Sequence, residues 1–552
     1  MKILVVSLLR LGDILLATSV LRSLRNEHPE AEIHILINGQ FRSVTSMIPF
    51  VSKVFSFDRE RIQEIIGTPE RSILEAYFRV EGLVEKLKSE CYDRVINLTH
   101  NRLSGWLTAL LDCPDTKGVI YGPQGKSSAG SEWFNYLNDF TEPGLGNAFH
   151  FVDIFHYGSC TESKDRRIEL VETPNGIHFA KKALTSFVKK KIVVIQPFSA
   201  EAKKTFKVSK WKEICKILKA IEPQIEIFVL GSHAESSQVD EICQSENIVG
   251  LACELDEAFS VLTRADLLIT NDTSIKHLAS ATKIKILEIS LGSSEYLRTG
   301  AYKDGAVIIQ ARVPCAPCSH RTGCTQLSHL CSEKISPDLV AMTASTILRH
   351  DEKALRFLAQ EDSDDVIIAK TTVNASGDWA AYPLAQIFNS KEISNWIDRA
   401  SFKLYLQGEH KKGIGLFGSE GLYLKKLLED IFPDRASLEW MNELKNLESE
   451  VESFENKVED FLGRLKKILG SLDVPEVLDN FLIEVEQFCE TTKGSTFSSY
   501  GHQIAWSIRD PKMNVGQFET VRKLRERLSC AHQRTKIELR LIRGLQTVFK
   551  EA

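Results

Sequence analysis

Long apolar runs are missing from this sequence. No stretch approaches the ~18–20 apolar residues that a helix needs to span a bilayer. The apolar stretch at the N-terminus is short, because Arg10 and Asp13 interrupt it, and no cleavage site of small residues follows. We therefore expect neither a membrane span nor a signal peptide, and a protein of the cytoplasm is the default.

A large excess of charge of one sign is also missing. The 552 residues carry a formal net charge of −5, which argues against general nucleic-acid binding. Hydrophobic residues make up 43% of the chain, which is enough for ample cores. The length predicts two to four globular domains.

Strands and helices alternate over the first two thirds of the chain, which predicts α/β domains with parallel sheets covered on both faces. A first set of strands is expected at residues 2–6, 32–37, 53–57, 94–98 and 119–121. After a looser polar stretch at about 161–190, a second set is expected at residues 192–195, 225–230, 248–251, 267–270, 285–290 and 306–310. Two such sheets form a cleft between them, which is the usual place for a small-molecule site. The predicted domains are residues 1–165 and 185–350.

From residue 351 to 552 strand patterns nearly vanish, and we expect an all-helical domain of unknown role. Apolar residues here keep a heptad spacing, with Glu and Lys on the flanks. The seam is formed by Leu444, Leu447, Val451, Phe454, Val458, Phe461, Leu465 and Ile468. Such a seam indicates either one helix of a bundle packing its own core or a coiled coil that oligomerises or binds a partner helix.

Asp13 follows the first predicted strand at the point where a helix begins. Ligands sit at such strand ends in open α/β sheets. A carboxylate there would repel a phosphate, so it suits a general base aimed at a neutral hydroxyl. The alternative is that Asp13 only caps the helix, a role that Asp favours.

A second polar turn, Asn271-Asp272-Thr273-Ser274, ends a strand of the second sheet. Free backbone N–H groups at a helix start suit an anion such as a diphosphate, and Thr273 and Ser274 add hydroxyl donors. His277 lies one turn into the helix and can face the same site. Taken alone, however, this sequence is an ordinary helix cap.

Two further loops follow strands on the same side of the second sheet. One is rich in lysine, and Lys204, Lys207 and Lys210 are candidates to reach a phosphate, although such lysines are usually solvated. The other contains Glu235, which could accept hydrogen bonds from ribose hydroxyls. The second domain therefore has the parts of a nucleotide site.

These motifs, in this order and at these intervals, resemble glycosyltransferase family 9, the ADP-heptose:lipopolysaccharide heptosyltransferases. They are Arg10-Leu11-Gly12-Asp13-Ile14-Leu15, the lysine-rich loop before Trp211, Gly231-Ser232-His233-Ala234-Glu235, and Asn271-Asp272-Thr273-Ser274-Ile275-Lys276-His277. The resemblance covers roughly residues 1–350. It implies a GT-B fold of two Rossmann-like domains and an inverting, metal-independent transfer from a nucleotide sugar, without a catalytic cofactor.

Residue by residue, the resemblance implies that Asp13 is the base. It places the donor at Asp272, Thr273, Ser274 and His277, with Glu235 at the nucleoside. The family's phosphate-binding lysine lies two residues before the Trp, where this chain has Ser209. Which lysine of this chain contacts the phosphate is therefore left open.

Acceptor contacts are expected from the first domain, because arginines would grip the anionic groups of a lipopolysaccharide core. The candidates are Arg10, Arg59, Arg61, Asn101 and Arg102, and the alternative for each is simple surface polarity.

Four cysteines lie within 17 residues in a loop at 315–331. Cys315, Cys318, Cys324 and Cys331 give the spacing C-x₂-C-x₅-C-x₆-C, which suits a structural Zn or Fe ion. Two disulfides or unligated thiols are the alternatives. The remaining cysteines are scattered through apolar segments and are expected to be core residues.

The leading hypothesis is a heptosyltransferase that acts on a lipopolysaccharide core, with peripheral contact at the cytoplasmic face of the inner membrane. One alternative keeps the donor but has a protein as acceptor. Another is a non-catalytic GT-B-like scaffold whose helical domain binds partners.

Overall fold

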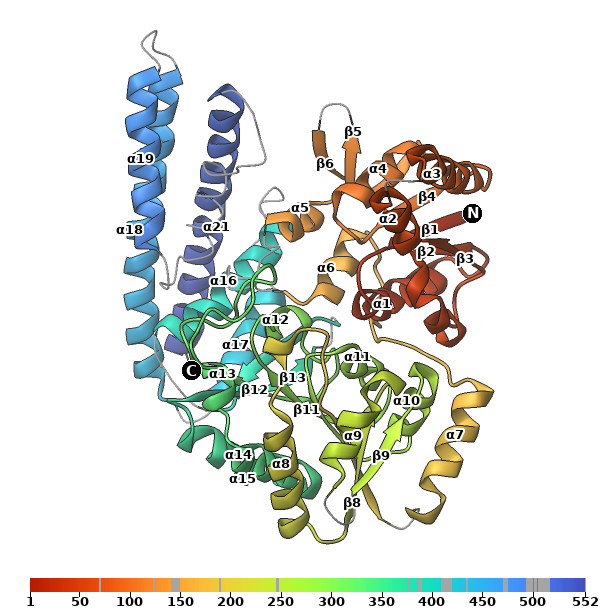
Figure 1. Cartoon of the computed structure of the whole chain (residues 1–552). Coiled ribbons are helices and arrows are strands. Elements are labelled where there is room, and N and C mark those ends of the chain that lie inside the picture. The colour runs from red at the N-terminus through yellow and green to blue at the C-terminus, as the bar shows by residue number, and fades with distance from the viewer. Residues whose placement is uncertain are drawn as a thin grey trace. The chain divides into compact units, whose positions relative to one another are not determined.

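The computed structural model describes residues 1–68, 71–122, 125–139, 149–187, 190–244, 248–374, 377–385, 390–408, 419–432, 435–469, 475–492, 500, 504 and 517–551. These residues form two compact units, and the division comes after Ala385. The first unit is α/β and the second is helical (Figure 1).

The first sheet has six strands in the order β3-β2-β1-β4-β5-β6, and all pair in parallel except β6 against β5. Its strands are β1 (Lys2–Ser7), β2 (Glu32–Asn38), β3 (Lys53–Phe57), β4 (Arg94–Asn97), β5 (Asp115–Gly122) and β6 (Gly125–Ala129). Its helices are α1 (Leu11–Glu27), η1 (Gly39–Met47), α2 (Arg59–Gly67), α3 (Ile73–Lys88), α4 (Arg102–Leu110), α5 (Glu132–Asp139) and α6 (Phe151–Gly158). Strand β1 is buried from Ile3 to Ser7, as expected for a strand with helices on both faces.

The second sheet has eight strands in the order β14-β13-β12-β11-β10-β7-β8-β9. They are β7 (Lys191–Gln196), β8 (Ile225–Gly231), β9 (Ile248–Ala252), β10 (Leu267–Asn271), β11 (Lys285–Ser290), β12 (Val307–Ala311), β13 (Val366–Val373) and β14 (Trp379–Pro383). Strands β7 to β12 are parallel and have the Rossmann order, whereas β13 and β14 are antiparallel additions. The GT-B architecture of two Rossmann-like sheets is thus confirmed.

The helices around the second sheet are short, and several carry the caps that their sequences predict. They are α7 (Pro174–Leu184), η2 (Thr185–Phe187), η3 (Ala202–Lys204), α8 (Val208–Ile221), η4 (His233–Glu235), α9 (Ser236–Ile242), α10 (Leu255–Leu262), α11 (Ser274–Ser280), α12 (Tyr296–Thr299), α13 (Leu330–Glu333), α14 (Pro337–Arg349) and α15 (Glu352–Glu361). The expected loose connection at 161–190 contains α7, which starts with a Thr173 cap and Pro174 and packs against α10.

The second sheet also continues past residue 351, where the sequence predicts the helical domain to begin. Strands β13 and β14 add to the edge at β12, and this compact unit extends to Ala385. Trp379 is fully buried in β14, which explains why these strands are part of the α/β core.

The second unit contains α16 (Ser390–Leu406), α17 (Ser419–Ile431), α18 (Ser437–Leu469), α19 (Pro475–Thr491) and α21 (Gln517–Glu551). Helices α18, α19 and α21 are the long helices in blue in Figure 1. All eight seam residues of α18 are buried, and part of the seam packs with residues of α19 and α21 in one core. This arrangement favours a bundle that covers its own seam.

Among the described helices, none combines the length and the apolar composition that crossing a bilayer requires.

Candidate functional site

Both Rossmann-like sheets reverse their strand order at one point, and the candidate residues follow the strands at these points. In the first sheet the reversal lies between β1 and β4, and in the second it lies between β7 and β10. Ligands in open α/β sheets bind at such switch points, beyond the carboxyl ends of the strands. Asp13 follows β1, and Asp272 follows β10, so topology alone puts both at binding positions.

Asp13 lies in the first turn of α1 and is half-buried. Its Oδ2 accepts a hydrogen bond of 3.1 Å from the backbone N–H of Arg10, so it does cap the helix. Burial raises the pKa of Asp13, while the Arg10 hydrogen bond and the charges of Arg10, Arg298 and Lys204 oppose that rise. A carboxyl with a raised pKa is a better proton acceptor than an ordinary one, which suits a general base.

The start of α1 meets the start of α11 at Gly12. A Cβ atom at Gly12 would lie 3.1 Å from Cδ2 of His277, so the missing side chain permits this close approach. Burial and the charge of Lys276 lower the pKa of His277 to about 3, so its ring is neutral. Within the described residues, His277 Nδ1 is buried without a hydrogen-bond partner, which leaves it available to a bound group.

Lys204 is the lysine that the fold brings to this site. Its Nζ donates a 2.9 Å hydrogen bond to Asp272 Oδ2, and both side chains are almost fully buried. Lys207 is exposed at the start of α8, and Lys210 donates instead to the carbonyls of Ser332 and Ile335. The structure therefore separates Lys204 from the other two candidates.

Thr273, Ser274 and Glu235 lie at the strand ends where the sequence puts them. Thr273 Oγ1 donates to Gln196 Oε1 at 3.1 Å, and Ser274 is the first residue of α11. Glu235 Oε2 accepts hydrogen bonds of 2.8 Å from both the N–H and the hydroxyl of Ser232. Glu235 is thus held in a fixed orientation beside the end of β8.

The sequence motifs did not single out three residues of the candidate site. Glu201 Oε1 lies 3.1 Å from Arg10 Nη1, so an ion pair joins the loop after β7 to the loop after β1. Arg298 on α12 is buried and acts on Asp13 through its charge. Lys276 is buried between Asp272 and Glu288. Glu201 and Arg298 lie outside the sequence motifs, and Lys276 lies inside one without a role that the motif assigns, so the side-chain packing reveals all three.

The Cys-rich loop docks beside the same site. Lys203 Nζ donates to the carbonyls of Ser319 and Thr322, both at 2.6 Å, so the loop packs on η3, which carries Lys204. It also brings His320 Nδ1 to 3.6 Å from Glu201 Oε1. The loop therefore lies beside Lys203 and Glu201, closer to the candidate site than the sequence suggests.

The four thiols of this loop lie near one another but do not form a ready metal site. Burial, and then the charges of Cys315, Cys318 and Cys324, raise the pKa of Cys331. In the part of the chain that the structure describes, however, no three His, Cys, Asp or Glu side chains converge at ligand distance. All twelve cysteines are free thiols among these described residues, so the paired-disulfide alternative is not seen.

The candidate acceptor-binding residues form one group near the loop of Asp13 and another group farther from it. Asn101 caps α4 by accepting from the Ser104 N–H at 2.9 Å, and Arg102 is exposed beside it. This loop is joined to the loop after β1, since the Leu8 N–H donates to Thr99 Oγ1 at 2.7 Å.

Arg59 and Arg61 follow β3, the edge strand two positions from β1. Arg61 pairs with Glu64 on its own helix. The far group therefore shares the ligand-binding edge of the sheet but not the immediate surroundings of Asp13.

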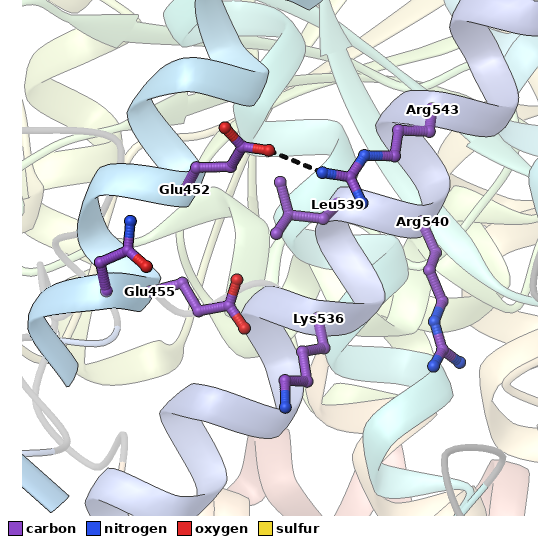
Figure 2. Close-up of a pocket in the computed structure, with 7 residues that line it drawn as sticks. Glu452, Glu455, Lys536, Leu539, Arg540 and Arg543 are labelled. Carbon is purple, nitrogen blue, oxygen red and sulfur yellow. Dashed lines mark hydrogen bonds and ion pairs between the residues drawn. The ribbon is translucent and has the colours of Figure 1, made fainter. Parts of the chain in front are cut away.

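The helical unit has a groove of its own between α18 and α21 (Figure 2). It is lined by Glu452, Glu455, Asn456, Lys536, Leu539, Arg540 and Arg543. Arg543 pairs with Glu452 at 2.6 Å, as the dashed line marks. Exposed charges of both signs are typical of the solvated face of two packed helices and do not outline a catalytic site.

Comparison with known proteins identifies a family for part of the α/β unit. Residues 80–329 match the family model described as glycosyltransferase family 9 (heptosyltransferase). This segment belongs to glycosyltransferase family 9. The match confirms the resemblance that the sequence motifs predicted, and over the matched residues it supports a glycosyltransferase.

Two sequence relatives are named as heptosyltransferases. The chain is 23% identical to lipopolysaccharide heptosyltransferase 3 of Escherichia coli K12 over 307 residues, which cover 52% of this chain and 81% of that protein. A shorter match, 29% identical over 86 residues, covers 15% of this chain and 26% of lipooligosaccharide heptosyltransferase 2 of Campylobacter jejuni. A solved structure, E. coli ADP-heptose lps heptosyltransferase II, aligns with 64% of this chain and all of that chain, at 17% identity and a TM-score of 0.46.

Proposed function

We propose that this glycosyltransferase moves a heptose from ADP-heptose to a hydroxyl of a lipopolysaccharide core, with inversion at the anomeric carbon. The observation that carries the proposal is the setting of Asp13, a carboxyl of raised pKa beside three cations. Its loop meets the α11 turn at Gly12 and His277. A base and a cation-rich anion site on opposite sides of one cleft are what a single-step transfer requires.

The proposed reaction breaks one bond and forms one. The acceptor oxygen attacks the anomeric carbon while the bond from that carbon to the diphosphate oxygen breaks. Asp13 takes the hydroxyl proton, and the diphosphate leaves with the electron pair. Lys204 and the hydroxyls of Thr273 and Ser274 stabilise the negative charge that develops on the diphosphate.

The remaining roles follow the positions of the residues. Asp272 and His277 would face the donor sugar and Glu235 the nucleoside, while Lys207 and Lys210 are less well placed than Lys204. Arg10, Asn101 and Arg102 would contact the acceptor, and Arg59 and Arg61 would do so only if it extends along the sheet edge. Such an acceptor would place the protein at the cytoplasmic face of the inner membrane.

The four-cysteine loop would hold a structural Zn or Fe ion away from the reaction itself. Cys315, Cys318, Cys324 and Cys331 supply the four thiolates that tetrahedral ligation requires once the loop rearranges to bring them together. The proposal predicts about one metal ion per chain in freshly purified protein. Less than about a tenth of an equivalent by elemental analysis would refute it.

The proposed function is tested with donors and acceptors in one assay. Purified full-length protein is incubated with ADP-heptose, and separately with UDP-sugars, together with a heptose-deficient lipopolysaccharide core. We expect transfer from ADP-heptose to the core. Transfer only to a co-expressed protein would favour a protein acceptor. Absence of both transfer and donor hydrolysis would favour a non-catalytic scaffold.

A further inference from the structure

Lys276 is a fully buried lysine beside the proposed donor site. It lies on α11, and none of its side chain is exposed. Its Nζ donates to Asp272 Oδ1 at 2.5 Å and to Glu288 Oε1 at 2.8 Å. Glu288 is itself fully buried on β11, and its other oxygen accepts the Ala301 N–H at 3.0 Å.

These contacts form a row of four charges that alternate in sign. Lys204 pairs with one oxygen of Asp272, Lys276 pairs with the other oxygen, and Glu288 balances Lys276. The charges of both lysines hold the pKa of Asp272 well below its usual range. Asp272 is therefore an ionised carboxylate with two counter-ions.

Lys276 matters as a second counter-ion of Asp272 because the proposed function requires Lys204 at the diphosphate. In the proposed function Lys204 must turn toward the diphosphate of the donor. If Lys204 were the only partner of Asp272, this movement would leave a buried carboxylate unpaired, which is strongly unfavourable. With Lys276 in place, Asp272 stays neutralised when Lys204 leaves.

We propose that Lys276 is a positioning residue for donor binding, which it supports by acting as the permanent counter-ion of Asp272 and so keeping Lys204 available for the diphosphate. This inference rests on the proposed function, and it assigns a role to a residue that contacts no substrate. A purely structural role is the competing explanation. Buried ion pairs contribute little net stability compared with apolar residues of similar volume, so the two explanations can be separated by experiment.

The main test is the double variant Lys276→Met with Glu288→Gln in the full-length protein. Methionine fills the space of the lysine chain, and glutamine retains an oxygen for the Ala301 N–H, so neither charge is left alone. We expect a melting temperature close to that of the wild type. The affinity for ADP, measured by calorimetry, should fall about tenfold, within the range for residues of one ion-pair network.

A triple variant separates the charge effect from a loss of shape. Adding Asp272→Asn removes the carboxylate that holds Lys204, so the affinity for ADP should recover toward the wild-type value. A matched control is Lys303→Met, because Lys303 Nζ donates to the carbonyls of Thr282 and Ile284 and forms no ion pair among the described residues. This control should leave ADP binding unchanged.

The outcomes are distinct. If the wild type binds ADP and the double variant binds it equally well, Lys276 has only a structural role and the inference is wrong. If the triple variant stays as weak as the double variant, Lys276 does not act through Asp272, and the inference is also wrong. If the wild type binds neither ADP nor UDP, the proposed function itself fails and this inference fails with it.

Discussion

Asp13 shows how one side chain serves local structure and chemistry together. Its carboxylate accepts the Arg10 N–H and so fixes the start of α1. The same carboxylate is close enough to Lys204 and Arg298 for their charges to act on its pKa. Capping and catalysis were alternatives for the sequence, but the geometry is compatible with both at once.

The variant Asp13→Asn should keep the fold and lose transfer. Asparagine retains an oxygen for the Arg10 N–H but cannot take a proton, so the rate should fall by about 10²–10⁴-fold. Because the carboxyl pKa is raised in the folded protein, ionised Asp13 is a stability cost, and the variant should melt no lower than the wild type. The control is Asp351→Asn, a cap on α15 that accepts the Ala354 N–H. Wild-type turnover in Asp13→Asn would exclude this base.

The pH profile should report the same carboxyl. Transfer requires ionised Asp13, so kcat/KM should fall as the pH drops through a pKa that lies above the ordinary value of 3.8. His277, with a pKa of about 3, stays neutral over this range and adds no second limb. The profile is measured on wild type and on Asp13→Asn with equal donor saturation. A limb that persists unchanged in the residual activity of Asp13→Asn would belong to another group.

At the scale of single elements, the turn from β10 into α11 gathers most of the proposed donor contacts. We expect Thr273→Val combined with Ser274→Ala to weaken ADP binding by about 1–3 kcal/mol, because hydroxyl hydrogen bonds to a charged group are lost. Calorimetry gives the affinity, and Ser280→Ala at the other end of α11 is the control. Equal affinity for ADP in variant and wild type would show that the diphosphate does not bind at this turn.

Helix α18 offers a second test at this scale. Phe461 is fully buried in the seam and packs against Phe481 and Phe488. Phe461→Ala should lower the free energy of unfolding of the helical unit by about 3–5 kcal/mol, whereas the exposed Glu459→Ala should change it little. If Phe461→Ala instead dissociates an oligomer and leaves unfolding unchanged, the seam is an interchain coiled coil.

Helices and strands were easier to predict from the sequence than the contacts between them. The strands at Lys53–Phe57 and Lys285–Ser290 follow from apolar runs in the sequence and lie where expected. Strands β13 and β14 escaped prediction because they are short additions inside a largely helical pattern. The ion pair of Glu201 with Arg10 escaped because it joins segments that are distant in the sequence. The pairs of Lys276 escaped because only the burial of its side chain shows that Asp272 and Glu288 surround it.

At the scale of the whole molecule, the division after Ala385 predicts two thermal unfolding transitions. A ligand stabilises only the unit that binds it, so ADP at about 100 times its Kd should add about 2.7 kcal/mol to the α/β unit alone. Scanning calorimetry with and without ADP measures both transitions. A single transition that shifts as a whole would show that the two units unfold together.

The close approach of Gly12 to His277 also has a mechanical consequence. The starts of α1 and α11 are already close there, so they have little room to approach further along the line that joins these residues. Any further approach of the two Rossmann-like halves would then be a rotation about this contact. Groups near this contact, such as Asp13, would then move less than groups farther from it, such as the arginines after β3. Asp13 would thus keep its position relative to His277, while the contacts of the arginines with the acceptor change.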